Sequence, residues 1–244
     1  MCDNPSNLPS THFLVRSADR ENYWETTSSD FTINLQRSLK GQKAQISYLQ
    51  LPVSYYNVTQ NNNTFTANVV DAAETTINIT PGSYNVSDII TALQTAMSFL
   101  GTMTISLNPI TFLITISCNN IFYMNFNINN SIARLLGFNP NLTYGGQLSY
   151  TAQNPPKLFD NAIYISCNFS TTIQTTTKAL HNVSFVIPHN VNKGEIIQFY
   201  NSSQFTLMPK IKDFTIGNII IRVFNEDGKI LQNLGDWVMM LEII

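Results

Sequence analysis

Residues 102–128 of this 244-residue chain read TMTISLNPITFLITISCNNIFYMNFNI, and they decide the fold class. Apolar and polar side chains alternate in three runs within this stretch: TMTISL, TFLITISC and IFYMNFNI. A period of two places alternate side chains on opposite faces of a β-strand. The runs are separated by Asn-Pro at residues 108–109 and by Asn-Asn at residues 119–120, which are typical of turns. We therefore predict three short strands joined by turns.

The same alternation recurs along most of the chain. The further runs are FTINLQ (31–36), KAQISY (43–48), AIYISC (162–167), VSFVI (183–187), EIIQFY (195–200), FTIGNIIIRVF (214–224) and WVMMLEII (237–244). Residues 225–229, NEDGK, indicate a tight hairpin, because Asp-Gly readily supplies the positive φ angles of such a turn. Many short strands separated by turns favour an all-β sandwich or barrel.

Two segments have helical rather than strand-like spacing. The first, residues 85–101, carries Asn85 where an N-cap belongs, Asp88 to complete a capping box, and Gly101 to end the helix. The second is SIARLLG, from a Ser131 cap to a Gly137 stop. We expect both helices to cover an open end or edge of the sandwich. The Pro- and Gly-rich residues 138–161 predict a long excursion with one strand inside.

Charged side chains are scarce. The chain has 13 Lys and Arg and 15 Asp and Glu, so 11% of its residues are charged, against roughly 25% in an average domain. Hydrophobic residues make up 43%, which excludes charge-driven disorder and provides ample core. The net charge of −2 argues against specific nucleic-acid binding, which needs a basic face. We expect a polar, partly extended N-terminal arm over residues 1–30 and one domain over 31–244, with a helical insertion near 85–100.

The start of the chain and its cysteines bear on the cellular compartment. MCDNPSNLPS lacks the basic and apolar regions of a secretory signal, and no apolar run is long enough to span a bilayer. Of the three cysteines, Cys118 and Cys167 lie in strand-like runs, and we expect buried free thiols there. These features favour a soluble protein made in a reducing cytoplasm.

Residues with catalytic or metal-binding potential are few. The histidines, His12, His181 and His189, have no Cys or carboxylate at ligand spacing, so we expect no metal and no cofactor. No nucleophile motif is present, and we expect no enzyme. Four carboxylates cluster near the N-terminus, in a segment that reads as solvated: Asp19, Glu21, Glu25 and Asp30. A glycan-cleaving enzyme remains a weaker alternative.

The basic residues and the tryptophans leave two further readings open. Arg37, Lys40 and Lys43 are either a solvated turn between two strands or a weak contact to an acidic partner. Trp24 lies in the polar arm, where we expect it to be exposed, whereas Trp237 lies in a strand and is expected in the core. An exposed aromatic among many amide side chains keeps carbohydrate binding open.

The order of motifs resembles the minor capsid, or penton, proteins of virophages and polinton-like viruses, within the adenovirus-like capsid lineage. The motifs are Ser17-Ala18-Asp19-Arg20 followed by TTSSDFTINL, then YLQLPVSYYNV (48–58), PGSYNVSDIITALQTAM (81–97), ARLLGF (133–138) and VFNEDGKILQNLGDWVMMLEI (223–243), the last read as a hairpin. Each motif is short, but the series covers most of the chain in the expected order.

The resemblance implies a single jelly roll with two four-stranded antiparallel sheets, one or two short helices and long loops. It implies a homopentamer at the vertices of an icosahedral capsid, next to a double jelly-roll major capsid protein. The protein would be made in the host cytoplasm and located in the virion. Arg16, Asp19 and Arg20 would help to dock the N-terminal arm, unless that arm is an exposed tail.

Low charge also suits a subunit whose surface is covered by neighbours, because charged residues are depleted in interface cores. The alternative function is a carbohydrate-binding jelly roll used in attachment, such as a fibre or spike head.

Overall fold

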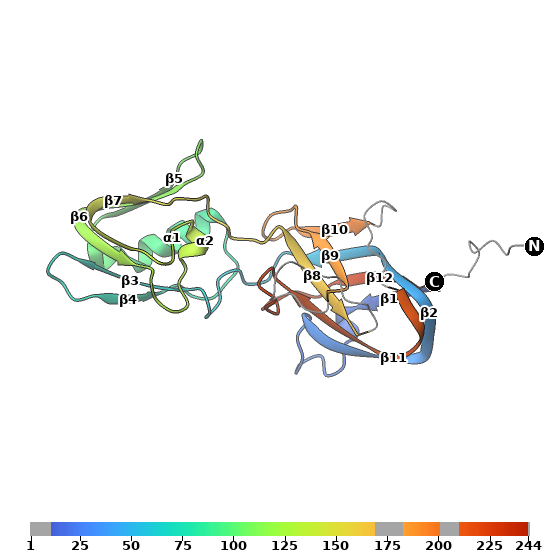
Figure 1. The fold of residues 1–244 in the computed structure, drawn as a ribbon. Coiled ribbons are helices and arrows are strands. Elements are labelled where there is room, and N and C mark those ends of the chain that lie inside the picture. Colours follow the sequence, from blue (N-terminus) through green and yellow to red (C-terminus); the bar gives the residue numbers. More distant parts are fainter. Residues whose placement is uncertain (1–10, 169–182, 201–209, 244) are drawn as a thin grey trace, which may run out of the picture. The chain divides into compact units, whose positions relative to one another are not determined.

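The structure, a computed structural model, describes residues 11–168, 183–200 and 210–243, without the side chains of residues 37–43 and 210–216 (Figure 1). The chain divides into two compact units. Unit 1 comprises Met1–Tyr55 and Asp160–Ile244, and unit 2 comprises Tyr56–Phe159. Both are built mainly from strands, which confirms the all-β class. The division differs from the expected single domain, because the middle of the chain has a sheet, helices and a core of its own.

Unit 1 contains a seven-stranded antiparallel sheet in the order β1-β12-β2-β11-β8-β9, with β10 also pairing with β2. Its elements are β1 (Thr11–Arg16), the 3₁₀ turn η1 (Ser17–Asp19), β2 (Asp30–Pro52), β8 (Ala162–Cys167), β9 (Phe185–Pro188), β10 (Ile196–Tyr200), β11 (Lys210–Phe224) and β12 (Val238–Ile243). The strands expected at both ends of the chain are all present.

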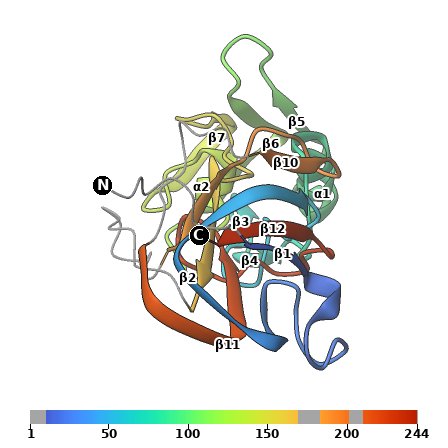
Figure 2. The same cartoon turned by 90° about the vertical axis from the view of Figure 1, so that its right-hand side faces the viewer.

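Strand β2 is one continuous strand of 23 residues rather than two strands joined by a turn. Its first part pairs with β11, and its last part pairs with β12 and β10, so that β2 curves from one half of the sheet to the other (Figure 2). The prediction of a turn around Arg37, Lys40 and Lys43 is therefore wrong. Pairing with β11 extends to Lys43, and it provides backbone partners where we expected the sheet to end.

Alternate residues of these strands form the core of unit 1. The buried apolar residues include Val15, Phe31, Ile33, Ala44, Ile46, Leu49, Leu51, Ile163, Ile165, Cys167, Phe185, Ile187, Ile197, Ile219, Ile221, Val223, Trp237, Met239, Leu241 and Ile243. Trp237 packs edge-on against Phe31, with ring centroids 5.7 Å apart. The period-two pattern in the sequence thus marks the buried face correctly.

Unit 2 contains a five-stranded antiparallel sheet in the order β4-β3-β6-β5, with β7 pairing with β6. Its elements are β3 (Thr64–Val69), β4 (Thr75–Asn78), α1 (Val86–Ala96), the 3₁₀ turn η2 (Ser98–Leu100), β5 (Met103–Leu107), β6 (Ile114–Asn125), α2 (Ala133–Leu136) and β7 (Thr143–Thr151). The sheet curls around the two helices (Figure 1). Ile89 and Leu93 of α1 and Leu136 of α2 lie in the core of this unit, so the helices do more than cover an edge.

Strand β6 also runs through a predicted turn. Asn119 and Asn120 lie inside this strand, and their side chains bond to backbone groups at the end of the preceding 3₁₀ turn η2. The side-chain nitrogen Nδ2 of Asn120 donates to the Leu100 carbonyl oxygen over 2.8 Å, and Asn119 Oδ1 accepts from the Thr102 N–H over 2.9 Å. Residues that usually break strands here satisfy the backbone groups on either side of Gly101.

The predicted helix ends are close to those observed. Asn85 accepts from the Asp88 N–H over 2.8 Å and Asp88 from the Asn85 N–H over 3.1 Å, which confirms the capping box. The second helix begins two residues after Ser131, whose hydroxyl accepts from the Ala133 N–H. Gly137 ends it with a φ of 83°.

The predicted hairpin at residues 225–229 is only partly present. Gly228 has a φ of 72°, and the Asn225 N–H donates to the Lys229 carbonyl oxygen, so the tight turn is confirmed. Only one bridge follows it, between Phe224 and Ile230. The terminal strand β12 does not return along β11, because it pairs with β1 and β2 instead.

Gly137 is a position where the fold needs glycine. A Cβ atom there would lie 1.9 Å from the carbonyl oxygen of Asn154. Gly146 has a similar φ of 78°, but a Cβ atom on it would meet nothing within 4 Å. Replacing Gly146 therefore tests the cost of backbone strain alone, and replacing Gly137 adds the cost of steric overlap.

We predict that Gly146→Ala lowers the free energy of unfolding by about 1 kcal/mol, the cost of a left-handed conformation for a non-glycine residue. Gly137→Ala should cost about 2 kcal/mol more, because its methyl group overlaps Asn154. Calorimetric unfolding of the two variants checks the difference. Equal losses would mean that the segment at Asn154 can move away freely.

Candidate assembly surface

Residues 17–29, which we call the N-terminal turn, are fastened to the residue that precedes β12. The Ser17 N–H donates to the Trp237 carbonyl oxygen over 2.9 Å, and the Trp237 N–H donates to Ser17 Oγ over 2.8 Å. The indole N–H of Trp237 donates to the Ser28 carbonyl oxygen over 2.7 Å. Ser17, Ser28 and Ser29 are buried. Together with β1, which pairs with β12, the turn is part of unit 1. Residues 1–10 of the polar, partly extended arm expected over residues 1–30 lie outside the described residues.

An ion pair between Arg20 and Asp236 fastens the turn to the segment before β12. The Arg20 guanidinium lies 2.7 Å from Asp236 Oδ1, and it also donates to the Ser17 carbonyl oxygen over 2.7 Å. Its side chain is only 8% exposed. Tyr23 donates its hydroxyl proton to Asp236 Oδ2 over 2.7 Å, and the guanidinium carbon of Arg20 lies 3.9 Å from the centre of the Tyr23 ring. The Asp236 carboxylate therefore holds the side chains of both Arg20 and Tyr23 in place.

The protonation of Asp236 reflects these contacts. Partial burial alone would raise the pKa of this carboxyl group, but hydrogen bonds from Tyr23, Arg20 and Ser17 outweigh burial, and the pKa lies below its ordinary value of 3.8. A lowered pKa in the folded state means that the ionised group stabilises the fold at neutral pH. That stabilisation is lost as the pH falls through the pKa of the folded state.

Trp24 stands at the outside of this turn. It is 93% exposed, as predicted, and its ring meets the Tyr23 ring edge-on with centroids 4.9 Å apart. Tyr23 is itself held by Asp236 and Arg20. An exposed tryptophan on an ordered base loses little conformational entropy on binding and can bury a large area. These are the properties of an interface anchor.

The predicted docking residues Arg16, Asp19 and Arg20 separate into two roles. Arg16 and Asp19 form a two-bond ion pair, with both distances 2.7 Å and side chains 59% and 45% exposed. Arg20 faces inward and bonds to Asp236 instead. The sequence analysis missed Asp236, because it lies 216 residues away and only the pairing of β1 with β12 brings it near.

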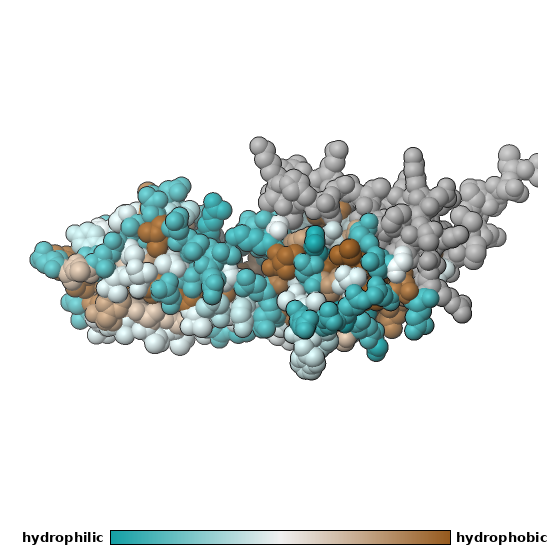
Figure 3. All heavy atoms as spheres, turned by 90° about the horizontal axis from the view of Figure 1, so that it is seen from below, coloured by the Kyte–Doolittle hydropathy of each residue, from teal (hydrophilic) through white to brown (hydrophobic). Residues whose placement is uncertain are grey.

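A second exposed apolar group lies at the tip between β5 and β6 in unit 2. Ile110 is 86% exposed, and Phe112 beside it is also exposed, with a φ of 55°. Asn108 holds the tip, because its Oδ1 accepts from the Ile110 and Thr111 N–H groups. On the face of the molecule drawn in Figure 3, hydrophobic side chains lie singly or in small groups among polar ones.

The groups with catalytic potential lie apart in the described parts of the chain. Across residues 11–168, 183–200 and 210–243, no three His, Cys, Asp or Glu side chains gather as metal ligands would. His12 is exposed, His189 Nδ1 lies 2.9 Å from the Asp160 carbonyl oxygen, and His181 lies outside the described residues. Three of the four N-terminal carboxylates have separate partners: Asp19 bonds to Arg16, Glu21 to Asn34 and Asp30 to Arg222.

Cys118 and Cys167 are buried free thiols, as predicted, whereas Cys2 lies outside the described residues. Burial raises the pKa of Cys167 to about 12, so this sulfur is a thiol at neutral pH. Within the same described ranges, no helix has both the length and the apolar character needed to cross a bilayer.

We predict that Asp236→Asn lowers the free energy of unfolding by about 1 kcal/mol at pH 7, discounted for the partial exposure of the carboxylate. The difference from the parent protein should shrink as the pH falls below 3.8 and disappear once Asp236 is protonated in the folded state. Urea unfolding followed by Trp fluorescence measures both. Asp19→Asn, which breaks only the exposed pair with Arg16, is the control and should change little. A loss for Asp236→Asn that is independent of pH would contradict the electrostatic role.

Solved structures similar to this chain over nearly its whole length include two from viral particles or their proteins. The mavirus penton protein superposes with a TM-score of 0.56 and 9% sequence identity, over 96% of this chain and 97% of the other. A chain of the Sputnik virophage structure matches over 97% and 98% of the two chains, with 10% identity and a TM-score of 0.47.

No family model and no curated protein sequence matches the chain. The likeness is thus one of structure at low sequence identity. It confirms the predicted jelly-roll fold, although the two sheets have seven and five strands rather than the four each that the resemblance implies.

Proposed function

We propose that this chain is a structural protein of a virion, the vertex capsomer of an icosahedral capsid, which acts by assembling as a homopentamer and carries no active site. The observation that supports this most is the match to the mavirus penton protein, which extends over nearly the whole of both chains. A match of that extent includes unit 2 as well as unit 1. The likeness is therefore not confined to one of the two units.

The low charge supports an assembly role independently. Only 11% of the residues are charged. Some of these charges are paired within unit 1: Arg16 with Asp19, Arg20 with Asp236 and Arg222 with Asp30. A surface of amides, hydroxyls and scattered apolar groups costs less to desolvate than a charged one. Such a surface suits contact with neighbouring subunits in a particle.

We propose the N-terminal turn as a contact to a neighbouring capsomer, which would be the double jelly-roll major capsid protein. Trp24 would be the anchor, and the exposed Arg16–Asp19 pair would lie at the rim. Arg20 would act indirectly, because its bonds to Asp236 and its stacking on Tyr23 hold the base beneath Trp24. Residues 11–30 belong to the folded unit, so removing them would damage the fold as well as the contact.

We expect the purified protein to sediment as an assembly of five 27.4-kDa chains. Native mass spectrometry of the same sample counts the subunits directly. A trimer would favour a fibre or spike head, and a monomer at all concentrations would contradict self-assembly.

We expect Trp24→Ala to reduce incorporation into particles at least tenfold when it is expressed with the major capsid protein, because an interface anchor carries a large share of the binding energy. Trp24→Phe keeps an aromatic ring and should retain part of the incorporation. A variant without residues 1–10 keeps every described residue of the turn and separates its contribution from that of the segment before it. Normal incorporation of Trp24→Ala would rule out the turn as a docking surface.

A further inference from the structure

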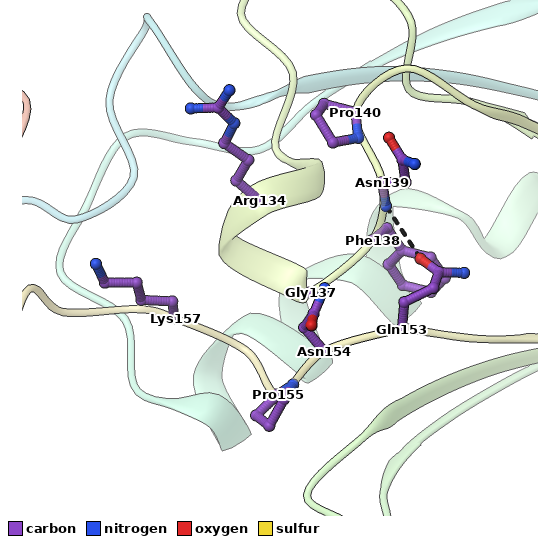
Figure 4. A pocket seen from close by; sticks show the side chains of 9 residues that line it. All are labelled: Arg134, Gly137, Phe138, Asn139, Pro140, Gln153, Asn154, Pro155 and Lys157. Carbon is purple, nitrogen blue, oxygen red and sulfur yellow. Dashed lines mark hydrogen bonds between the residues drawn. The ribbon is translucent and has the colours of Figure 1, made fainter.

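A pocket of about 440 Å³ lies in unit 2, around the C-terminal end of α2 (Figure 4). The residues that line it come from α2 and from two loop segments, 137–140 and 153–157: Arg134, Gly137, Phe138, Asn139, Pro140, Gln153, Asn154, Pro155 and Lys157. Its volume is in the range of small-molecule sites. Two cations, three amides and two proline rings thus share one hollow.

The charges of unit 2 are distributed unevenly. Its 104 residues contain only five charged side chains: Asp71, Glu74, Asp88, Arg134 and Lys157. Both basic residues line this pocket, and no carboxylate does. Glu74 instead bonds to Thr66 and Asn125, and Asp88 caps α1. The entire positive charge of the unit is therefore placed at one hollow, which favours an anionic ligand.

Backbone hydrogen bonds hold the two sides of the pocket together. The Gln153 and Asn154 N–H groups both donate to the Gly137 carbonyl oxygen, over 3.2 and 3.0 Å. The Lys157 N–H donates to the Leu135 carbonyl oxygen over 3.0 Å. Arg134 and Lys157 thus extend from segments that are fixed to each other. The pocket is formed before any ligand arrives, which reduces the entropic cost of binding.

The side chains of Gln153 and Arg134 keep hydrogen-bond donors for a ligand at the pocket. Gln153 Oε1 accepts from the Tyr144 hydroxyl over 2.8 Å and from the Asn139 N–H over 3.1 Å, which leaves its amide N–H groups for a ligand. Among the residues that the structure describes, the Arg134 guanidinium has no hydrogen bond or ion pair. In Figure 4, Arg134 and Lys157 extend to one side of the pocket, and Asn139 and Gln153 lie on the other. Charge recognition and amide recognition are thus separated in space.

We propose that this pocket binds an acidic carbohydrate, with the sugar carboxylate at Arg134 and Lys157 and the hydroxyls at the amides of Asn139, Gln153 and Asn154. A bare inorganic anion is much smaller than the pocket and would leave the amides unused. Acidic peptide motifs are typically recognised by clusters of arginines, whereas Arg134 is the one arginine among the lining residues. The rings of Pro140 and Pro155 offer apolar faces against which a sugar ring packs.

The test is titration of the full chain with a carboxylated oligosaccharide that contains uronic or sialic acid, followed by calorimetry or by ligand-observed NMR. The methyl ester of the same sugar serves as its neutral match. We expect the acid to bind and the ester to bind about tenfold more weakly, because the charge-assisted hydrogen bonds are lost. Arg134→Ala and Lys157→Ala should each weaken binding of the acid about tenfold. Lys229→Ala, which removes an exposed cation from unit 1, should leave binding unchanged.

Three outcomes would overturn the proposal: equal binding of acid and ester, unchanged binding by both variants, or an acidic peptide or phosphate that binds as well as the sugar. The proposal goes beyond the vertex role and does not depend on it. Sedimentation of the same variants distinguishes the pocket proposal from the vertex proposal. A change in subunit number would concern assembly, whereas a change in sugar affinity at constant subunit number concerns the pocket.

Discussion

Unit 1 depends on the continuity of β2. Three strands pair with it directly, since β11 uses its first part and β12 and β10 use its last part. Strand β1 reaches the sheet through β12, and β8 through β11. A chain break or a turn in the middle of β2 would separate the two halves of the sheet. The N-terminal turn also depends on this pairing, because Ser17 and Trp237 meet only where β1 and β12 lie side by side.

Several of the few charged groups have clear structural roles. In unit 1, Asp236 orients Arg20 and Tyr23, and burial of Arg20 is tolerated because its partner and the Ser17 carbonyl oxygen satisfy it. In unit 2, Asp88 caps a helix and Glu74 bonds across neighbouring strands. Arg134 differs from these groups, since it has no bonded partner among the described residues. The same amino acid, arginine, therefore serves the fold in one unit and faces solvent beside a pocket in the other.

Local sequence patterns predicted most elements but not their continuity. The capping box at Asn85 was predictable because a cap is satisfied within four residues. Asn119 and Asn120 resembled a turn, yet they bond to backbone near Gly101, and spacing along the sequence does not reveal such a contact. The docking residues were only partly predictable for the same reason. Arg16 finds its partner three residues away, whereas the partner of Arg20 lies at the other end of the chain.

The two proposed surfaces follow from different physical properties and can therefore change independently. The N-terminal turn gains its binding capacity from an exposed aromatic group, Trp24, whose supporting charges are already neutralised within the unit. Burial against a neighbour would then need little desolvation of charge. The pocket beside α2 has the opposite character, since no carboxylate lines it and the Arg134 guanidinium would gain most from an anion. A surface meant for permanent contact in a particle is expected to hide its charges internally, and a surface meant for a soluble acidic ligand is expected to keep them available.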